Sequence, residues 1–192
     1  MNVFDIAIHG TSLTVDRNAR NWPIIWEKSM QVGRVSRIKT YLTGREGQAS
    51  GYGLANIQPV VNLRPRAAVL EWINDANPAQ GVSISQAASN WTAMVAAIRS
   101  GSPNTSIYFM LASQPRADAI AATFPNLAGY DARIRSLAIT LGVQLIDVRT
   151  AWGDPVLHPE EYAVDDGIHP LLSGLQRVTM PLMTATFGPL IP

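Results

Sequence analysis

The chain contains no cysteine among its 192 residues. This absence excludes disulfide bonds, thiolate metal sites and a cysteine nucleophile. Charged residues make up only 15% of the chain, and the formal net charge is +1 at pH 7. A nearly neutral chain lacks the bulk positive charge that draws proteins to nucleic acid, so we expect no nucleic-acid partner.

Long hydrophobic runs are also missing, and no apolar stretch approaches the roughly 20 residues of a membrane-spanning helix. The first residues, MNVFDIAIHG, are typical of a strand and include neither a basic leader nor a small-residue cleavage site. We therefore expect no secretory signal. These features predict a soluble protein, either cytoplasmic or part of a larger or virion-associated assembly, and they leave the oligomeric state open.

Hydrophobic residues make up 47% of the chain, which favours one globular domain over residues 1–192. Five short segments are typical of strands, and four of them are nearly continuous in apolar residues. Such runs indicate strands buried on both faces of a parallel sheet. The five segments are residues 3–8, 33–41, 67–73, 106–112 and 143–148.

Helical patterns separate these strands, at residues 21–32, 83–101, 130–142 and 171–187. Ser83 or Ser85 can cap the second helix, and Gly101 and Gly142 suit helix ends. Pro181 interrupts the last pattern. Alternation of strand and helix predicts an α/β fold with a parallel sheet between helices, and in such folds ligands bind beyond the carboxyl ends of the strands.

Ser12 follows the first predicted strand in the sequence HGTSLT. A serine at this place is either an ordinary turn residue or a nucleophile. A free hydroxyl is a poor nucleophile near neutral pH, so the second interpretation requires a base elsewhere in the chain.

The segment DDGIHP, residues 165–170, contains one of the three histidines. Asp166 precedes His169 by three residues, and a loop with this spacing can turn the carboxylate onto one ring nitrogen. The other nitrogen is then available to take a proton. The alternatives are a helix-capping aspartate beside a surface histidine, or a metal site. No further ligand cluster lies nearby in the sequence, so we expect no metal.

Polar or small residues follow the second and third predicted strands as well. Asn74 and Asp75 come directly after the third, and the Asn74 amide suits a developing oxyanion, although Asn-Asp is also common in turns. The segment TGREGQASGYG, residues 43–53, is rich in glycine without matching a phosphate-binding loop. A glycine there lets a backbone N–H approach a reacting oxygen.

Together these blocks resemble the SGNH hydrolases, the GDSL-type esterase and lipase family. The matching segments are residues 10–13 (GTSL), Gly47, residues 74–75 (ND) and residues 166–170 (DGIHP), in family order. The resemblance extends over roughly residues 3–187. It implies a three-layer α/β/α sandwich, flavodoxin-like, with about five parallel strands.

The resemblance also implies a role for each block. Ser12 would be the nucleophile, His169 the general base and then acid, and Asp166 the residue that orients the imidazole. The backbone N–H groups of Ser12 and Gly47, with the Asn74 side chain, would form the oxyanion hole. This machinery performs acyl transfer through an acyl-enzyme and needs no metal or organic cofactor.

Two residues depart from the family pattern. Thr11 stands where an aspartate usually precedes the serine, and we expect altered local hydrogen bonding there. Trp72 stands where the third block usually has glycine. Its indole either disturbs the placement of Asn74 or walls the acyl pocket and restricts it to short groups.

The family acts on lipid esters, thioesters, aryl esters and acetylated sugars. Because no long apolar loop suggests a lid, we expect a short-acyl esterase acting on a small-molecule or carbohydrate ester, with O-acetyl groups on carbohydrate as one candidate. The alternatives are a lipase or thioesterase for longer chains, a catalytically impaired binding or structural module, and a nucleotide-binding domain. Arg116 is a candidate contact for an anionic substrate. Several aromatic residues are candidates for facing the site: Trp22, Trp26, Tyr52 and Trp152.

Overall fold

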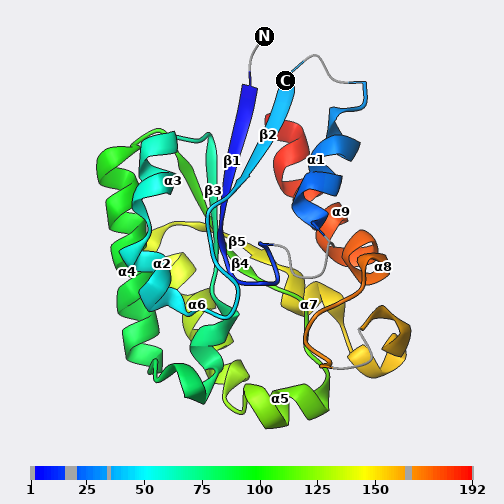
Figure 1. Ribbon diagram of the computed structural model, residues 1–192. Coiled ribbons are helices and arrows are strands. Elements are labelled where there is room, and N and C mark those ends of the chain that lie inside the picture. Colours follow the sequence, from blue (N-terminus) through cyan, green and yellow to red (C-terminus); the bar gives the residue numbers. More distant parts are fainter. Residues whose placement is uncertain (1–2, 16–20, 34–35, 163–165, 192) are drawn as a thin grey trace.

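The structure is a computed structural model that describes residues 3–15, 21–33, 36–162 and 166–191 (Figure 1). All strands of the sheet run parallel, in the order β2-β1-β3-β4-β5. They are β1 (Val3–Gly10), β2 (Arg37–Leu42), β3 (Ala67–Glu71), β4 (Ser106–Leu111) and β5 (Gln144–Asp147). The order and the flanking helices confirm the predicted flavodoxin-like α/β/α class. The strand predicted over 33–41 begins at Arg37, and residues 34–35 lie outside the described residues.

Side chains alternate between the two faces of the sheet, as the two-residue period of a strand requires. In β3, Ala67 and Val69 join the apolar cluster on one face, whereas Ala68 and Leu70 join the cluster on the other. Every residue of β3 is buried. Burial on both faces explains why this strand appears in the sequence as a continuous apolar run.

Helices cover both faces of the sheet (Figure 1). One face is covered mainly by α1 (Trp22–Gln31) and α9 (Met180–Phe187), with α7 (Val148–Trp152) and α8 (Leu172–Gly174) beside them. The other is covered by α2 (Ser50–Ala55), α3 (Gln58–Leu63), α4 (Ile84–Gly101) and α6 (Leu127–Leu141). α5 (Ala117–Thr123) lies at the end toward which the strands point. Among the described residues, no helix combines the length and apolar character needed to cross a bilayer.

Helix ends follow the capping signals in the sequence. Ser83 caps α4, since its Oγ accepts the Gln86 N–H at 3.1 Å. Gly142 ends α6 with φ 60°, the left-handed conformation that favours glycine. The predicted helix over 171–187 contains a π-helical segment (Leu175–Thr179) between α8 and α9. Pro181, which lacks an N–H, follows that segment closely and accounts for the break in regular hydrogen bonding.

Candidate active site

Ser12 lies in a tight turn at the carboxyl end of β1. The Thr11 carbonyl accepts the Thr14 N–H at 3.0 Å and the Val15 N–H at 2.8 Å, which closes this turn. In the sheet, β1 lies between β2 and β3. The connection after β1 leads to one side and the connection after β2 leads back to the other, and ligands of such sheets usually bind at this point of reversal. The Ser12 Oγ atom lies 2.8 Å from Nε2 of His169.

The loop that carries His169 is organised by Asp166. Its Oδ1 accepts the N–H groups of Ile168 at 2.8 Å and His169 at 2.9 Å, and its Oδ2 lies 2.6 Å from Nδ1 of His169. Gly167 permits this turn with φ 62°. A carboxylate at Nδ1 favours the tautomer with hydrogen on Nδ1, which leaves Nε2 to accept the Ser12 hydroxyl.

Electrostatics keep Asp166 ionised. Burial opposes its ionisation, but hydrogen bonds from the His169 and Ile168 backbone and from the His169 ring outweigh burial and lower its pKa below the ordinary value. A negative charge at this place would stabilise an imidazolium on His169. Ser12, His169 and Asp166 therefore form one continuous hydrogen-bonded chain, as the sequence predicts for their positions.

A cavity of about 380 Å³ opens beside this chain. Ser12 and His169 line it together with Gly47 and Asn74, the two other predicted oxyanion residues. Gly47 is exposed and has φ 69°, a conformation that residues other than glycine rarely adopt. Thus the structure brings all residues of the predicted reaction centre to one edge of the sheet.

Asp75 ties the two oxyanion segments together beneath the cavity. Asn74 and Asp75 lie in a short 3₁₀ helix, η1 (Ile73–Ala76), after β3. The Asp75 carboxylate accepts the Ser50 N–H at 2.7 Å and the Trp91 indole N–H at 2.9 Å, and burial raises its pKa. Asn74 Nδ2 donates to the Gln48 carbonyl at 3.1 Å. These contacts fix η1 against the segment that carries Gly47.

Several cavity-lining residues were not identified from the sequence. The apolar ones belong to one packed cluster and form an apolar wall, and the others are polar. The apolar residues are Leu13, Ile73, Phe124 and Ile168, and the additional polar ones are Glu46, Asn77 and Thr123. Phe124 comes from the end of α5, a helix absent from the sequence prediction. The only sign of Phe124 in the sequence is its apolar side chain, which does not distinguish it from the many apolar core residues.

Trp72 does not line this cavity, which corrects the expectation that it walls the acyl pocket. Its side chain is 2% exposed and packs in the cluster between the sheet and α4. The ring meets His9 edge-on, with centroids 4.9 Å apart, and lies against Gly53, where an added Cβ would overlap the indole. Trp72 thus points away from the reaction centre, and Asn74 still lines the cavity.

Trp152 and Arg116 also lie outside the cavity. Trp152 is 1% exposed and packs against Tyr162 on the α9 face of the sheet, so the expected substrate contact is wrong. Arg116 pairs with Asp118 at 2.9 Å, and its backbone N–H donates to the Gly167 carbonyl at 2.8 Å. It supports the His169 loop from outside. Trp22 and Trp26 are core residues, and Tyr52 is half-buried against the opposite cluster.

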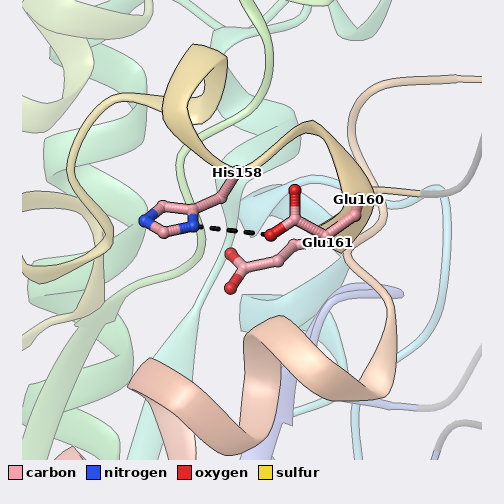
Figure 2. A group of neighbouring side chains, drawn as sticks. All are labelled: His158, Glu160 and Glu161. Carbon is pink, nitrogen blue, oxygen red and sulfur yellow. Dashed lines mark ion pairs between the residues drawn. The ribbon is translucent and has the colours of Figure 1, made fainter.

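Figure 2 shows the one group of three potential metal-ligating side chains found among the described residues: His158, Glu160 and Glu161. His158 Nδ1 lies 3.5 Å from Glu160 Oε1. Arg177, however, donates to both carboxylate oxygens of Glu161, with 2.7 Å between Nη2 and Oε2. One carboxylate of the group, that of Glu161, is therefore already paired with a cation.

The family model described as GDSL-like lipase/acylhydrolase matches residues 8–177. A search of curated protein sequences gives no match.

Solved structures resemble the whole chain at low sequence identity. A lipase/acylhydrolase from Enterococcus faecalis superposes with a TM-score of 0.83 at 15% identity, covering 100% of this chain and 98% of its own. LAE5, an α/β hydrolase enzyme from the metagenome of Lake Arreo in Spain, gives 0.79 at 20% identity, with coverage of 98% and 97%. An acetylxylan esterase from Geobacillus stearothermophilus, in a catalytic mutant, gives 0.76 at 13% identity, with coverage of 98% and 96%. These similarities support the fold.

Proposed function

The chain belongs to the GDSL-like lipase/acylhydrolase family, and from this premise we propose that it is a serine esterase that hydrolyses short-chain acyl esters. The observation that carries the proposal is the hydrogen-bonded chain from Ser12 through His169 to Asp166, with 2.8 Å and 2.6 Å between its heavy atoms. These distances are within the range required of a nucleophile, its base and the group that orients the base.

In this mechanism the Ser12 hydroxyl attacks the ester carbonyl while Nε2 of His169 takes its proton. The imidazolium then protonates the departing alcohol, which leaves an acyl group on Ser12. Water attacks the acyl-enzyme next, with His169 again as the base, and releases the acid. Asp166 holds the imidazole in the required tautomer and offsets its positive charge throughout.

The tetrahedral intermediate carries a negative oxygen that needs hydrogen-bond donors. The backbone N–H groups of Ser12 and Gly47 and the Asn74 amide are the proposed donors, since all three residues line the same cavity. Such donors stabilise the transition state more than the substrate when they are fixed beforehand. The contacts of Asn74 with Gln48 and of Asp75 with Ser50 provide that fixation.

The residues that line the cavity suggest what kind of substrate binds there. The apolar wall is the surface of a packed cluster, because Leu13, Ile73 and Phe124 are 7%, 8% and 1% exposed. A short acyl group fits against such a closed surface better than a long chain. Glu46 and Asn77, which also line the cavity, suit an alcohol with hydroxyl groups, which makes acetylated carbohydrate a candidate substrate.

A panel of esters tests this proposal. Hydrolysis of p-nitrophenyl acetate, p-nitrophenyl octanoate, an acetyl thioester and acetylated xylooligosaccharides is measured with the purified protein, with Ser12→Ala as the blank. We expect kcat/KM for the acetyl ester to exceed that for the octanoyl ester by at least about tenfold, because additional methylenes find no pocket. A preference for octanoyl would make the protein a longer-chain acylhydrolase. Absence of Ser12-dependent hydrolysis on every substrate would contradict the esterase function.

A further inference from the structure

Glu71 is a buried acid next to the reaction centre that the mechanism above does not use. We infer that it is a positioning residue, whose carboxylate holds the nucleophile turn and the oxyanion turn in register, and that Thr11 is the donor matched to it. The inference rests on the proposed function and deepens it, because it concerns how the same site is kept in place.

Glu71 is the last residue of β3, opposite Gly10 of β1, and is 1% exposed. Its Oε2 accepts the Thr11 N–H at 3.0 Å and the Thr11 hydroxyl at 2.8 Å, with the Thr14 hydroxyl at 3.3 Å. Its Oε1 accepts the Ile73 N–H at 2.8 Å. One carboxylate therefore bridges the ends of two neighbouring strands.

The bridge lies immediately beside the reacting groups. Thr11 precedes Ser12, and Ile73 precedes Asn74 in the chain. A displacement of Glu71 thus moves both the nucleophile and a proposed oxyanion donor. Since a misplacement of about 1 Å can lower a catalysed rate about 10²-fold, this contact bears directly on turnover.

Both oxygens of the Glu71 side chain act as hydrogen-bond acceptors, because each faces a backbone N–H and the other contacts come from hydroxyl groups. That is the hydrogen-bonding role of a carboxylate rather than of an amide or a carboxylic acid. A buried cation accompanies the charge: Arg149, 6% exposed, lines the same cavity of about 20 Å³ as Glu71. Glu71 is therefore placed in surroundings that suit a negative side chain.

Thr11 complements this acid chemically. The family pattern has an aspartate at this position, and an aspartate here would put a second carboxylate against Oε2 of Glu71. The threonine hydroxyl donates instead. This pairing accounts for the departure in the GTSL segment and predicts that residues 11 and 71 are energetically coupled.

A double-mutant cycle tests the coupling: Glu71→Gln, Thr11→Asp and the combined variant are assayed for kcat and KM on p-nitrophenyl acetate, with thermal melting followed for each. Glu71→Gln places an amide N–H₂ against donors, and we expect kcat to fall about 10- to 100-fold with little change in KM. Thr11→Asp should lower kcat at least as much. In the combined variant the introduced carboxylate can accept from the introduced amide, but the backbone N–H groups of residues 11 and 73 still face that amide. The fall in kcat should therefore be smaller than the product of the two single falls.

Glu27→Gln is the matched control. Glu27, in α1, accepts both the N–H and the hydroxyl of Thr40 in the same manner. Thr40 lies in β2, and neither residue lines the cavity. This variant should keep the wild-type kcat. Should Glu71→Gln fail to fold, Thr11→Val carries the test; it removes the hydroxyl donation to Glu71 at 2.8 Å together with a longer contact at 3.4 Å, in which the hydroxyl accepts the Leu13 N–H. A several-fold fall in kcat at unchanged KM supports the inference, and a wild-type kcat overturns it.

The outcomes separate this inference from the proposed function. A fall in kcat in the combined variant that is smaller than the product of the two single falls supports it. Independent effects of the two substitutions, or an unchanged kcat in Glu71→Gln, overturn it while Ser12-dependent hydrolysis by wild type leaves the esterase function standing. If wild type itself shows no Ser12-dependent hydrolysis, the esterase function fails and the inference fails with it.

Discussion

The Ser12 hydroxyl lies 2.8 Å from Nε2 of His169 although 157 positions separate the two residues in the chain. The parallel sheet makes this possible, since β1 delivers Ser12 to its carboxyl edge and the last loop returns there after β5. Asp166 holds the imidazole from the other side at 2.6 Å. The proposed nucleophile and its proposed base are thus aligned by the protein alone, before a substrate binds.

Asn74→Ala should lower kcat by roughly 10²- to 10³-fold, the usual cost of removing one oxyanion donor. KM should change little, because the donor is used mainly in the transition state. Steady-state kinetics on p-nitrophenyl acetate measure both constants. Asn104→Ala, an exposed asparagine near the opposite end of the sheet, is the control. Equal kcat values for the two variants would remove Asn74 from the oxyanion hole.

Gly44→Ala should destabilise the fold by more than about 2 kcal/mol, because an added Cβ would overlap the backbone of Gly10. Gly51→Ala is the matched control. It lies in α2, its nearest neighbour to an added Cβ is Asn90 at 3.8 Å, and replacing a helical glycine stabilises by up to about 1 kcal/mol. Urea unfolding measures the stability of both variants. A Gly44→Ala protein as stable as Gly51→Ala would show that β1 and the glycine segment are not in close contact.

Asp131→Ala should cost about 3–5 kcal/mol of unfolding free energy, because it breaks the buried ion pair with Arg149 at 2.9 Å. Burial already lowers the pKa of Arg149, and Asp131 opposes that shift. The exposed Asp118, paired with Arg116, is the comparison, and Asp118→Ala should leave stability nearly unchanged. Chemical denaturation of both variants measures the difference. Similar losses would mean that Arg149 finds another partner.

Stability should fall as the pH drops below about 6.5, partly because of His9. His9 is fully buried, and burial lowers its pKa below the ordinary value of 6.5, with its contacts to Gly53 and Thr43 opposing the shift. The unfolded chain then binds the proton first, so acid favours unfolding. Melting temperatures at about pH 7.5 and about pH 5.5 should differ more for wild type than for His9→Gln. Identical pH dependence in the two proteins would exclude His9 as a contributor.

Most of the fold was predictable because burial on both faces leaves a local pattern. The runs around β1, β3 and β4 are apolar throughout most of their length, and each proves to be an inner strand of the sheet. The sequence does not predict the helices α2 and α3, because Gly51 in α2 and Pro59 in α3 are residue types typical of loops. Gly53, also in α2, is needed because only glycine leaves room there for the Trp72 ring, a contact between residues distant in the sequence.

The site was predictable to the extent that its chemistry is local. The Asp166-to-His169 spacing and the serine after β1 can be recognised along the chain, and the structure brings them together. The direction of a side chain is not local information, so Trp72 and Trp152 were wrongly expected at the cavity. Glu71 was overlooked because a single acid in an apolar run gives no indication of the donors that meet it from the turn after β1.

Covalent labelling tests whether Ser12 is a nucleophile activated by His169. The protein is incubated with a fluorophosphonate probe, and the adduct is followed by intact mass and located by peptide mapping. We predict one adduct, on Ser12, none in Ser12→Ala, and labelling at least about 10²-fold slower in His169→Ala. An adduct on another residue, no adduct in wild type, or an unchanged labelling rate in His169→Ala would contradict the account.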